Sequence, residues 1–298
     1  MAKLFYCSTL TNIMKTTNTP HLLAAALTCA LASTLTARAN DTATTTSTPA
    51  TAPTMAAPAT TDADAWKFEV ALPLWASGIS GNATMFGRQE NVNVSFNTLR
   101  EHLDTVLGIA LAAQKGKVGV FGDVSYMKFS ASATKTVGPG EVKASLGLKF
   151  LLANAGLTYQ LVKTESEHPV LLEGTAGVRY WYTDTRIALS APGGPAVFEH
   201  SGTQNVYDPV FGLRASQYLT SKLHLDIAGD GGGFNINNST DWTWSAEGSL
   251  AYDFTKWFTA SAGYQAIGLD ESNGGTGTNK KGVDVIFSGV TIDLTFKF

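Results

Sequence analysis

The sequence predicts an all-β fold, an antiparallel up-and-down β-barrel that spans a membrane. Three observations predict it. Past residue 65 the chain consists of about ten segments in which apolar and polar side chains alternate, as along a strand with one apolar face. The connections between these segments alternate between short and long, and aromatic residues concentrate near both ends of the segments. Short turns on one rim, longer loops on the other and two aromatic girdles are typical of membrane barrels.

The alternating segments follow one another without a long helical stretch between them. The first, WKFEVALPLWA, places Phe68 and Val70 on one side, and the last, GVTIDLTFKF, places Leu294, Phe296 and Phe298 on one side. About ten strands are expected, or about eight if two of the weaker segments do not form strands. The predicted strands are residues 66–76, 104–114, 117–132, 142–161, 170–185, 205–219, 222–234, 241–254, 257–269 and 283–298.

The connections sort onto two rims. The tightest turns are 115–116, 220–221 and 255–256. The longest loops are 77–103, 186–204 and 270–282. Because short and long connections alternate, all the long loops fall at one end of an up-and-down barrel. A sandwich with Greek-key crossings has no reason to sort its loops in this way. The first long loop contains SFNTLREHLD, where Ser95 can cap a short helix with Phe96 and Leu99 on one face. This helix is expected on the rim or partly inside the mouth.

Aromatic residues mark both ends of the predicted strands, with aliphatic and small residues between them. Those near the tight turns are Trp66, Phe68, Tyr218, Tyr252, Phe254, Phe258, Phe296 and Phe298. Those near the long loops are Tyr126, Tyr180, Tyr182, Tyr207, Trp242, Trp244 and Tyr264. Amphipathic rings gather at the two interfaces of a membrane, so these sets predict two girdles.

Charged side chains gather on the strand face opposite the apolar one, which in a membrane barrel is the interior. The predicted interior set is Glu69, Asp123, Lys149, Glu173, Arg179, Asp208, Arg214, Asp226, Asp230, Glu247, Asp253 and Asp293. Lone charges away from water are unfavourable, so these groups are expected to pair into a network that fills a narrow lumen. The alternative is a narrow pore, which the excess of acids over bases would make weakly cation-preferring.

The segment before the barrel predicts export. Residues 1–39, with Met1 or Met14 as the start, contain a Lys, an apolar core and the small-residue ending ARA, which together predict a secretory signal peptide. Cys7 and Cys29 lie in this segment, so the exported chain is expected to hold no disulfide. Residues 40–65 are mainly Thr, Ala and Pro and predict a disordered leader, which leaves 66–298 as the barrel.

The sequence offers little chemistry beyond these charges. The formal net charge of −3 gives no reason to expect nucleic-acid binding. GDGGGF (229–234) lacks the spacing of a phosphate-binding loop, and no metal or cofactor motif is recognised, so neither is expected. Four histidines follow the signal peptide, at His102, His168, His200 and His224, and none is placed like a catalytic histidine beside a nucleophile. The chain is therefore predicted not to be an enzyme.

The last strand, with alternating apolar residues that end in Phe298, resembles the sorting signal of bacterial outer-membrane β-barrel proteins. The stretches LPLWASGISGN, VSFNTLREHLDT, GVFGDVSYMKFS, DPVFGLRAS, GDGGGF and GYQAIGLD resemble a group of largely uncharacterised proteobacterial outer-membrane barrel proteins. These resemblances imply that Phe298, Phe296 and Leu294 are recognised by the barrel-assembly machinery. They also imply a monomer surrounded by the lipid of the outer membrane of a Gram-negative bacterium.

The expected function is non-catalytic, in envelope structure or in surface interaction through the outer loops. The first alternative is the narrow small-solute channel. A soluble periplasmic β protein and a barrel enzyme are further, less favoured, alternatives. The sequence names no ligand, solute or binding partner.

Overall fold

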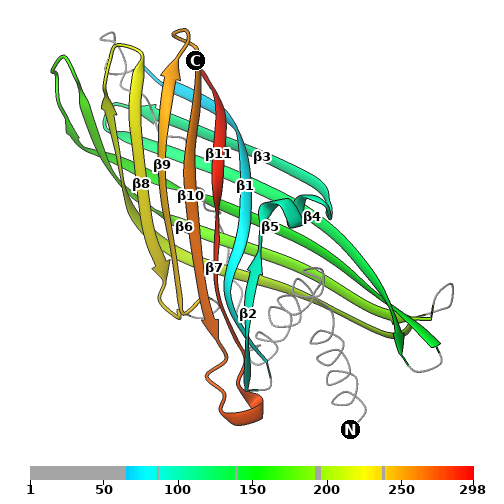
Figure 1. Ribbon diagram of the computed structural model, residues 1–298. Coiled ribbons are helices and arrows are strands. Elements are labelled where there is room, and N and C mark those ends of the chain that lie inside the picture. Colours follow the sequence, from blue (N-terminus) through cyan, green and yellow to red (C-terminus); the bar gives the residue numbers. More distant parts are fainter. Residues whose placement is uncertain (1–64, 86, 138–139, 192–195, 237–238) are drawn as a thin grey trace.

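The structure is a closed antiparallel β-barrel of ten strands, which confirms the predicted fold class (Figure 1). The computed structural model describes residues 65–85, 87–137, 140–191, 196–236 and 239–298. The predicted signal peptide, and the predicted leader up to residue 64, lie outside the described residues. The strands of the wall are β1 (Lys67–Met85), β3 (Leu103–Lys115), β4 (Val118–Val137), β5 (Gly140–Lys163), β6 (Val170–Ser190), β7 (Ala196–Tyr218), β8 (Leu223–Gly233), β9 (Trp242–Asp253), β10 (Phe258–Ser272) and β11 (Gly282–Lys297).

Each strand of the wall pairs with its neighbours in the sequence, and β11 returns to pair with β1. The closing ladder runs from Glu69, opposite Lys297, to Thr84, opposite Gly282. Phe68 and Phe298 extend it, because each backbone N–H donates to the carbonyl oxygen of the other, at 3.2 and 2.8 Å. Because β1 and β11 pair along this seam, neither strand exposes unpaired backbone groups to lipid there.

The two ends of the barrel differ, as the loop lengths predict. The connections β3–β4, β5–β6, β7–β8 and β9–β10 lie at the end where the C-terminus lies, which we call the turn end (Figure 1). The opposite end, which we call the loop end, holds the β4–β5 and β6–β7 hairpins and the β8–β9 and β10–β11 connections.

Much of what the sequence predicts as outer loops is strand. β6 and β7 stay paired up to Ser190, opposite Ala196, so the predicted loop 186–204 is wrong. In the predicted loop 77–103, β1 continues to Met85 and pairs with β2 (Arg88–Val94). These stretches are rich in Thr, Ser, Gly and Asn. Their outward side chains, such as Ser80 and Thr203, are mostly polar, and their buried inward side chains mix apolar groups such as Ile187 with polar ones such as Gln204. They therefore lack the apolar outward face of a strand at a membrane.

The predicted helix is present but shorter than expected. α3 spans Phe96–Arg100, and Ser95 caps it by accepting a hydrogen bond from the Thr98 N–H at 3.3 Å. A single turn, η1 (Gly277–Asn279), lies in the β10–β11 connection. In the part of the chain that the structure describes, no helix is long and apolar enough to cross a membrane.

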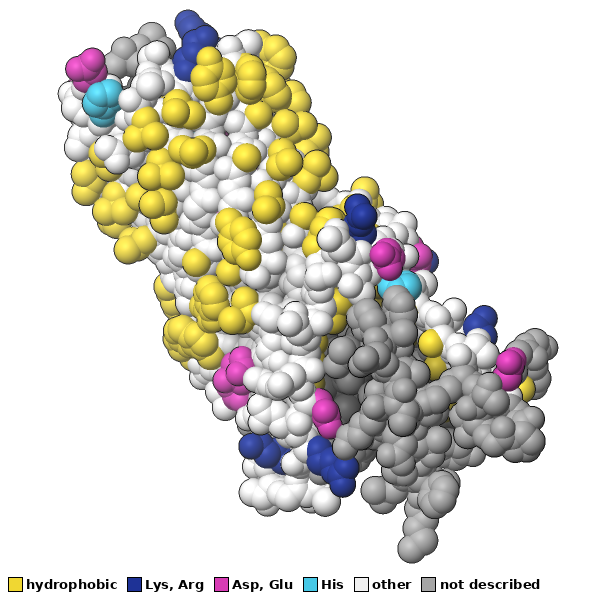
Figure 2. All heavy atoms as spheres, in the orientation of Figure 1, with side chains coloured by type: hydrophobic (Ala, Val, Ile, Leu, Met, Phe, Trp, Pro, Cys, Tyr) yellow, Lys and Arg dark blue, Asp and Glu magenta, His cyan; other side chains and the backbone are white. Residues whose placement is uncertain are grey.

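The outer wall carries the apolar side chains. Large side chains such as Leu74, Leu157, Phe211 and Val290 are more than half exposed, and the apolar groups spread over the wall in Figure 2. The outward-facing aromatic rings at the turn end form a chain of contacts: Phe258 lies 5.4 Å from Phe296 and 5.7 Å from Phe254 between ring centroids. Such a surface is unfavourable in water and suits lipid.

One residue of the predicted girdle at the turn end does not belong to it. Tyr218 shares the inward face of β7 with Arg214 and is only 8% exposed. Its hydroxyl donates to Asp253 at 3.1 Å, and its ring lies 4.8 Å from that of His224. A tyrosine can serve the interior as well as the interface because its polar end finds a carboxylate there.

Candidate functional site

The barrel interior is the candidate site, and it has two layers. Polar and charged side chains fill the half toward the turn end, and apolar side chains fill the half toward the loop end. The inward face of β11 shows the change, from Thr291, Asp293 and Lys297 near the turn end to Val285 and Phe287 near the loop end.

Arg179 is the centre of a polar cluster that we call the arginine network. It is 1% exposed, and its Nη2 donates to both carboxylate oxygens of Asp230 at 2.8 Å. Its Nε donates to Asn154 Oδ1 at 2.8 Å and its Nη1 to Thr243 Oγ1 at 3.1 Å. Asn154 in turn donates to both carboxylate oxygens of Asp123, at 3.2 and 3.3 Å. The network therefore ties β4, β5, β6, β8 and β9 together across the lumen.

Asp253 is the centre of a second polar cluster, next to the turn end. It accepts hydrogen bonds from Lys297 at 2.8 Å, from Tyr218 at 3.1 Å and from Thr259. Nδ1 of His224, a ring 2% exposed, lies 3.0 Å from Asp226 Oδ1. Carboxylates, a lysine, a tyrosine and a histidine thus close this end by bonding to one another.

Five further members of the predicted set lie between these clusters. Arg214 is 7% exposed, stacks on the Phe121 ring at 4.6 Å and interacts electrostatically with Glu173 and Glu247. Asp293 accepts a hydrogen bond from Ser261 at 3.0 Å. Glu69, which is 5% exposed, interacts electrostatically with Lys297 and also with nearby carboxylates, and its Oε2 has no hydrogen-bond partner among the described residues.

Asp208 holds the β8–β9 connection over the loop end. Its Oδ1 accepts hydrogen bonds from the backbone N–H and the hydroxyl of Thr240, at 2.7 and 3.0 Å. Its Oδ2 accepts one from the Trp181 indole at 2.8 Å. The carboxylate is fully buried, so it acts as a fixed anchor for this connection.

Lys149 corrects the predicted interior set. It is exposed on the outer face of β5 and donates to Asp184 at 3.0 Å. In LKFLLANAG the residues on both faces are apolar, because Phe150 and Leu152 face an apolar interior while Leu151 and Ala153 face outward. Alternation is therefore hidden in this stretch, and counting placed Lys149 on the wrong side. The other eleven predicted charges face the interior.

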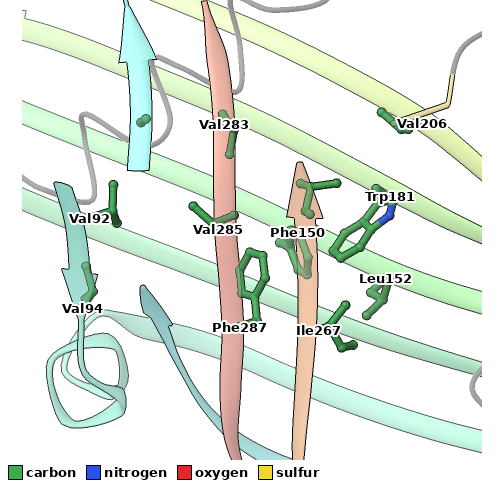
Figure 3. Close-up of a cluster of buried hydrophobic side chains, with 12 residues drawn as sticks. Val92, Val94, Phe150, Leu152, Trp181, Val206, Ile267, Val283, Val285 and Phe287 are labelled. Atoms are coloured by element: carbon green, nitrogen blue, oxygen red, sulfur yellow. The ribbon is translucent and has the colours of Figure 1, made fainter. Parts of the chain in front are cut away.

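The apolar layer, which we call the apolar plug, is a feature that the sequence reasoning missed (Figure 3). Rings and aliphatic groups from strands on different sides of the wall meet there, with Phe150 lying 5.8 Å from Trp181 and 5.5 Å from Phe287. Leu99 of α3 packs against the plug. The available signal was apolar residues side by side, as in VIF at 285–287. The plug consists of Ala83, Val92, Val94, Phe150, Leu152, Trp181, Val206, Ile267, Leu269, Val283, Val285 and Phe287.

A cavity of about 100 Å³ remains inside the barrel, between the plug and the cluster around Asp253. Its wall includes Pro73 and Trp75 of β1, Ala110 of β3, Glu247 of β9 and Ile267 of β10. The Trp75 indole N–H is buried without a hydrogen-bond partner among the described residues. The cavity is thus partly apolar and partly polar and is large enough for one small molecule.

The geometry gives no specific chemistry to these groups. Within the described ranges, no set of three His, Cys, Asp or Glu side chains is arranged to hold a metal ion. Apart from Lys149, the interior charges mostly bond to one another, which is what a structural network requires. The alternative prediction, that the interior charges line a cation-preferring pore, stays a prediction.

No protein-family model matches the chain, and no curated protein matches its sequence. Solved structures of similar arrangement include the outer membrane protease OmpT from Escherichia coli, at 12% identity and a TM-score of 0.47, covering 78% of this chain and 96% of that one. The translocator domain of the autotransporter NalP from Neisseria meningitidis is 13% identical, with a TM-score of 0.41 and coverage of 78% and 89%. The outer membrane protein OprG from Pseudomonas aeruginosa is 16% identical, with a TM-score of 0.29 and coverage of 79% and 97%.

Proposed function

We propose that this chain is a non-catalytic protein of the outer membrane of a Gram-negative bacterium that binds an extended polypeptide segment at its outer surface. The observation that carries the proposal is the free edge of β7 at the loop end. β7 pairs with β8 only over Val210–Tyr218, so Ala196–Pro209 has β6 on one side and no strand on the other within the described residues.

The location rests on physics of the outer wall. Its exposed apolar side chains, its ring of aromatic residues at the turn end and its closed seam suit a lipid bilayer, and bilayers accept strands only in a closed barrel. The last strand places Phe298, 77% exposed, beside the girdle, with Phe296 and Leu294 on the same face. That supports the proposal that the barrel-assembly machinery recognises these three residues after export by the signal peptide.

The binding role rests on the direction of the backbone groups of β7. The Tyr218 N–H donates toward β6, to Pro169, and the Leu219 N–H donates toward β8, to Leu223. Odd-numbered residues along β7 therefore direct N–H and C=O groups to the β8 side. Thr203 directs its own to the free edge. Such an edge is a template for strand addition, in which the backbone gives affinity.

The channel alternative has less support. The arginine network and the apolar plug cross the lumen in succession, and the cavity between them and the turn end is small. Stepwise currents in planar bilayers that change with Asp226→Asn or Glu247→Gln would favour the channel over a filled barrel.

Location and fold can be tested by gel mobility of the outer-membrane fraction, unboiled and boiled in SDS. We expect a heat-modifiable band in this fraction, because closed barrels resist SDS until heated. A variant lacking Phe298 should be depleted from the fraction, since the terminal aromatic is proposed as the sorting signal. A single heat-insensitive band in the soluble periplasm would contradict the membrane location.

The free edge can be tested with Thr203→Pro, which removes one N–H from the edge and leaves the bonds to β6 intact. Vesicles carrying the wild-type protein should bind a synthetic ten-residue peptide of alternating Thr and Val. Thr203→Pro should bind it at least tenfold more weakly, whereas the matched control Thr203→Ala should bind it like the wild type. Equal binding by all three proteins would overturn the role of this edge.

A further inference from the structure

The wall of the barrel is incomplete on one side of β1. β1 pairs with β3 only from Lys67, opposite Gln114, to Ala71, opposite Ala110. Toward the loop end, β1 next pairs on this side with β2, from Ile79 onward. Between these ladders, 72–78 of β1 and 103–109 of β3 have no strand partner on their facing edges among the described residues. In Figure 1, β1 stays beside β11 while β3 leaves it and runs with β4.

Pro73 stands at the point where the two strands part. Phe68 exchanges both backbone hydrogen bonds with Phe298, which follows β11, so odd-numbered residues of β1 direct their N–H groups to β3. Pro73 is odd-numbered and has no N–H, so it cannot continue the ladder. Continuing the register would place it opposite Gly108, and a Cβ on Gly108 would lie 2.7 Å from the Pro73 carbonyl oxygen. The two backbones therefore touch here and separate beyond this contact.

The break lies at the depth of the lipid. On either side of it, Leu74 is 57% and Leu107 65% exposed, and both belong to the apolar outer face. Val106 has the parity of the buried interior residues Ala110 and Ala112, yet it is 44% exposed. Because the Val106 side chain is on the inward face and is still exposed, no side chain of β1 covers it, and the wall has a gap at this point. At the loop end the break is bounded by the β2–α3 junction, because a Cβ on Gly78 would lie 3.0 Å from the Val94 carbonyl oxygen.

The inner side of the break is the cavity. Pro73, Trp75 and Ala110, which border the break, also line the cavity. Backbone without partners is tolerated at membrane depth only where protein covers it or where it lines a cavity. The unpartnered backbone of β1 at Pro73 and Trp75 therefore lies between the cavity and the outer face of the wall.

We propose that the break between β1 and β3 is a lateral port through which a small, mainly apolar molecule passes between the lipid and the interior cavity. The size of the cavity restricts the molecule to about one aromatic ring. The unpartnered Trp75 indole N–H calls for a hydrogen-bond acceptor on it, and the mixed lining suits a molecule with one polar end. The proposal is independent of the free edge of β7.

Nitrobenzene, one ring with acceptor oxygens, is the probe. The full chain, labelled with ¹⁵N-tryptophan and held in micelles, gives one indole resonance for each of its six tryptophans. The resonance of Trp75 is identified by its loss in Trp75→Phe. We expect nitrobenzene to shift this resonance until the site is saturated. The resonances of the lipid-facing indoles should instead shift in proportion to the amount of nitrobenzene dissolved in the micelle.

Two variants close the port in different ways. Val106→Phe fills the opening, and Pro73→Val restores the N–H that allows β1 and β3 to pair further. Each should weaken or slow the response of Trp75 at least tenfold, whereas Val120→Phe, a matched change on the lipid face of β4, should leave it unchanged. Heat-modifiable mobility checks that each variant folds. A wild-type Trp75 that does not respond saturably, or responses that persist in folded Val106→Phe and Pro73→Val, would overturn the port.

Discussion

Strands part from a neighbour at two seams of this barrel, β1–β3 and β7–β8, and a proline stands at each parting. At the position of Pro73 a backbone N–H would point toward β3, and at the position of Pro209, also odd-numbered, it would point toward β8. Proline has no N–H, so neither residue can donate across its seam. Continuing each register places a glycine opposite the proline, Gly108 in one seam and Gly233 in the other. The same local device ends the ladder in both places.

The two prolines lie at different depths along the barrel axis, and the parting of the strands has a different consequence at each depth. Pro209 lies nine residues before Tyr218 of the turn end, close to the full length of a membrane-spanning strand. β7 therefore leaves β8 at the edge of the lipid and continues as a sheet with β6 in water. Pro73 lies only six residues after the start of β1, so the same device opens the wall inside the lipid. What a proline does to a barrel depends on its depth.

The interior treats the two seams differently as well. At the β7–β8 side, the arginine network joins β6 to β8 and β9. Across the unpaired part of the β1–β3 seam, the described residues show no side-chain hydrogen bond or ion pair. Interior hydrogen bonds therefore join the strands around the β7–β8 seam, whereas among the described residues no such bonds join β1 to β3 along the unpaired part of their seam.

The largest expected effect comes from removing the interior tie, with Arg179→Ala. It leaves Asp230 buried beside an empty space, and breaking a buried pair in this way costs about 3–5 kcal/mol of unfolding free energy. Urea unfolding in vesicles, followed by gel mobility, measures it. Lys149→Met removes the exposed ion pair with Asp184 and should leave the urea midpoint unchanged. If both variants lose stability equally, the arginine network is not the tie proposed here.

A smaller effect, on cross-linking rate, sharpens the comparison at the free seam. In a background with Cys7 and Cys29 replaced by Ser, Val70→Cys with Leu111→Cys should form a disulfide readily, because these residues are paired. Leu74→Cys with Leu107→Cys would be opposite only if the ladder continued, and should cross-link at least tenfold more slowly. Adding Pro73→Val should raise that rate. Equal rates for the two pairs in the Pro73 protein would mean that the wall is closed.

The sequence predicted the wall well and its contents only in part. Alternation identified the ten strands, and it placed Arg179, Asp253 and most of their partners inside, because one lipid face forces a period of two. It could not show the apolar plug, since an apolar interior and an apolar exterior erase the alternation. That is also why Lys149, next to Phe150, was assigned to the wrong face.

The free edge and the port were visible in the sequence only as two prolines. A proline inside a predicted strand indicates an edge position. Which edge is lost depends on the hydrogen-bond parity, which the fold alone reveals. The outer hairpins were not predicted as strands because their outward face is polar, as at Thr203, and so lacks the apolar face that marks a strand at a membrane.

The pairing of β1 with β11 sets the order in which the molecule can fold. These are the first and last strands of the described chain, so their ladder joins residues that are very far apart in sequence, and such contacts form slowly. β1 with β2, and β3 to β10, can associate as local hairpins, but the ring can close only when β11 arrives. β1 pairs with β2 and with the end of β3 on one edge, so until closure its apolar outer face and the edge that pairs with β11 stay exposed. Assembly of this barrel is therefore most vulnerable to aggregation at β1, and a helper that holds the last strand would shorten that interval.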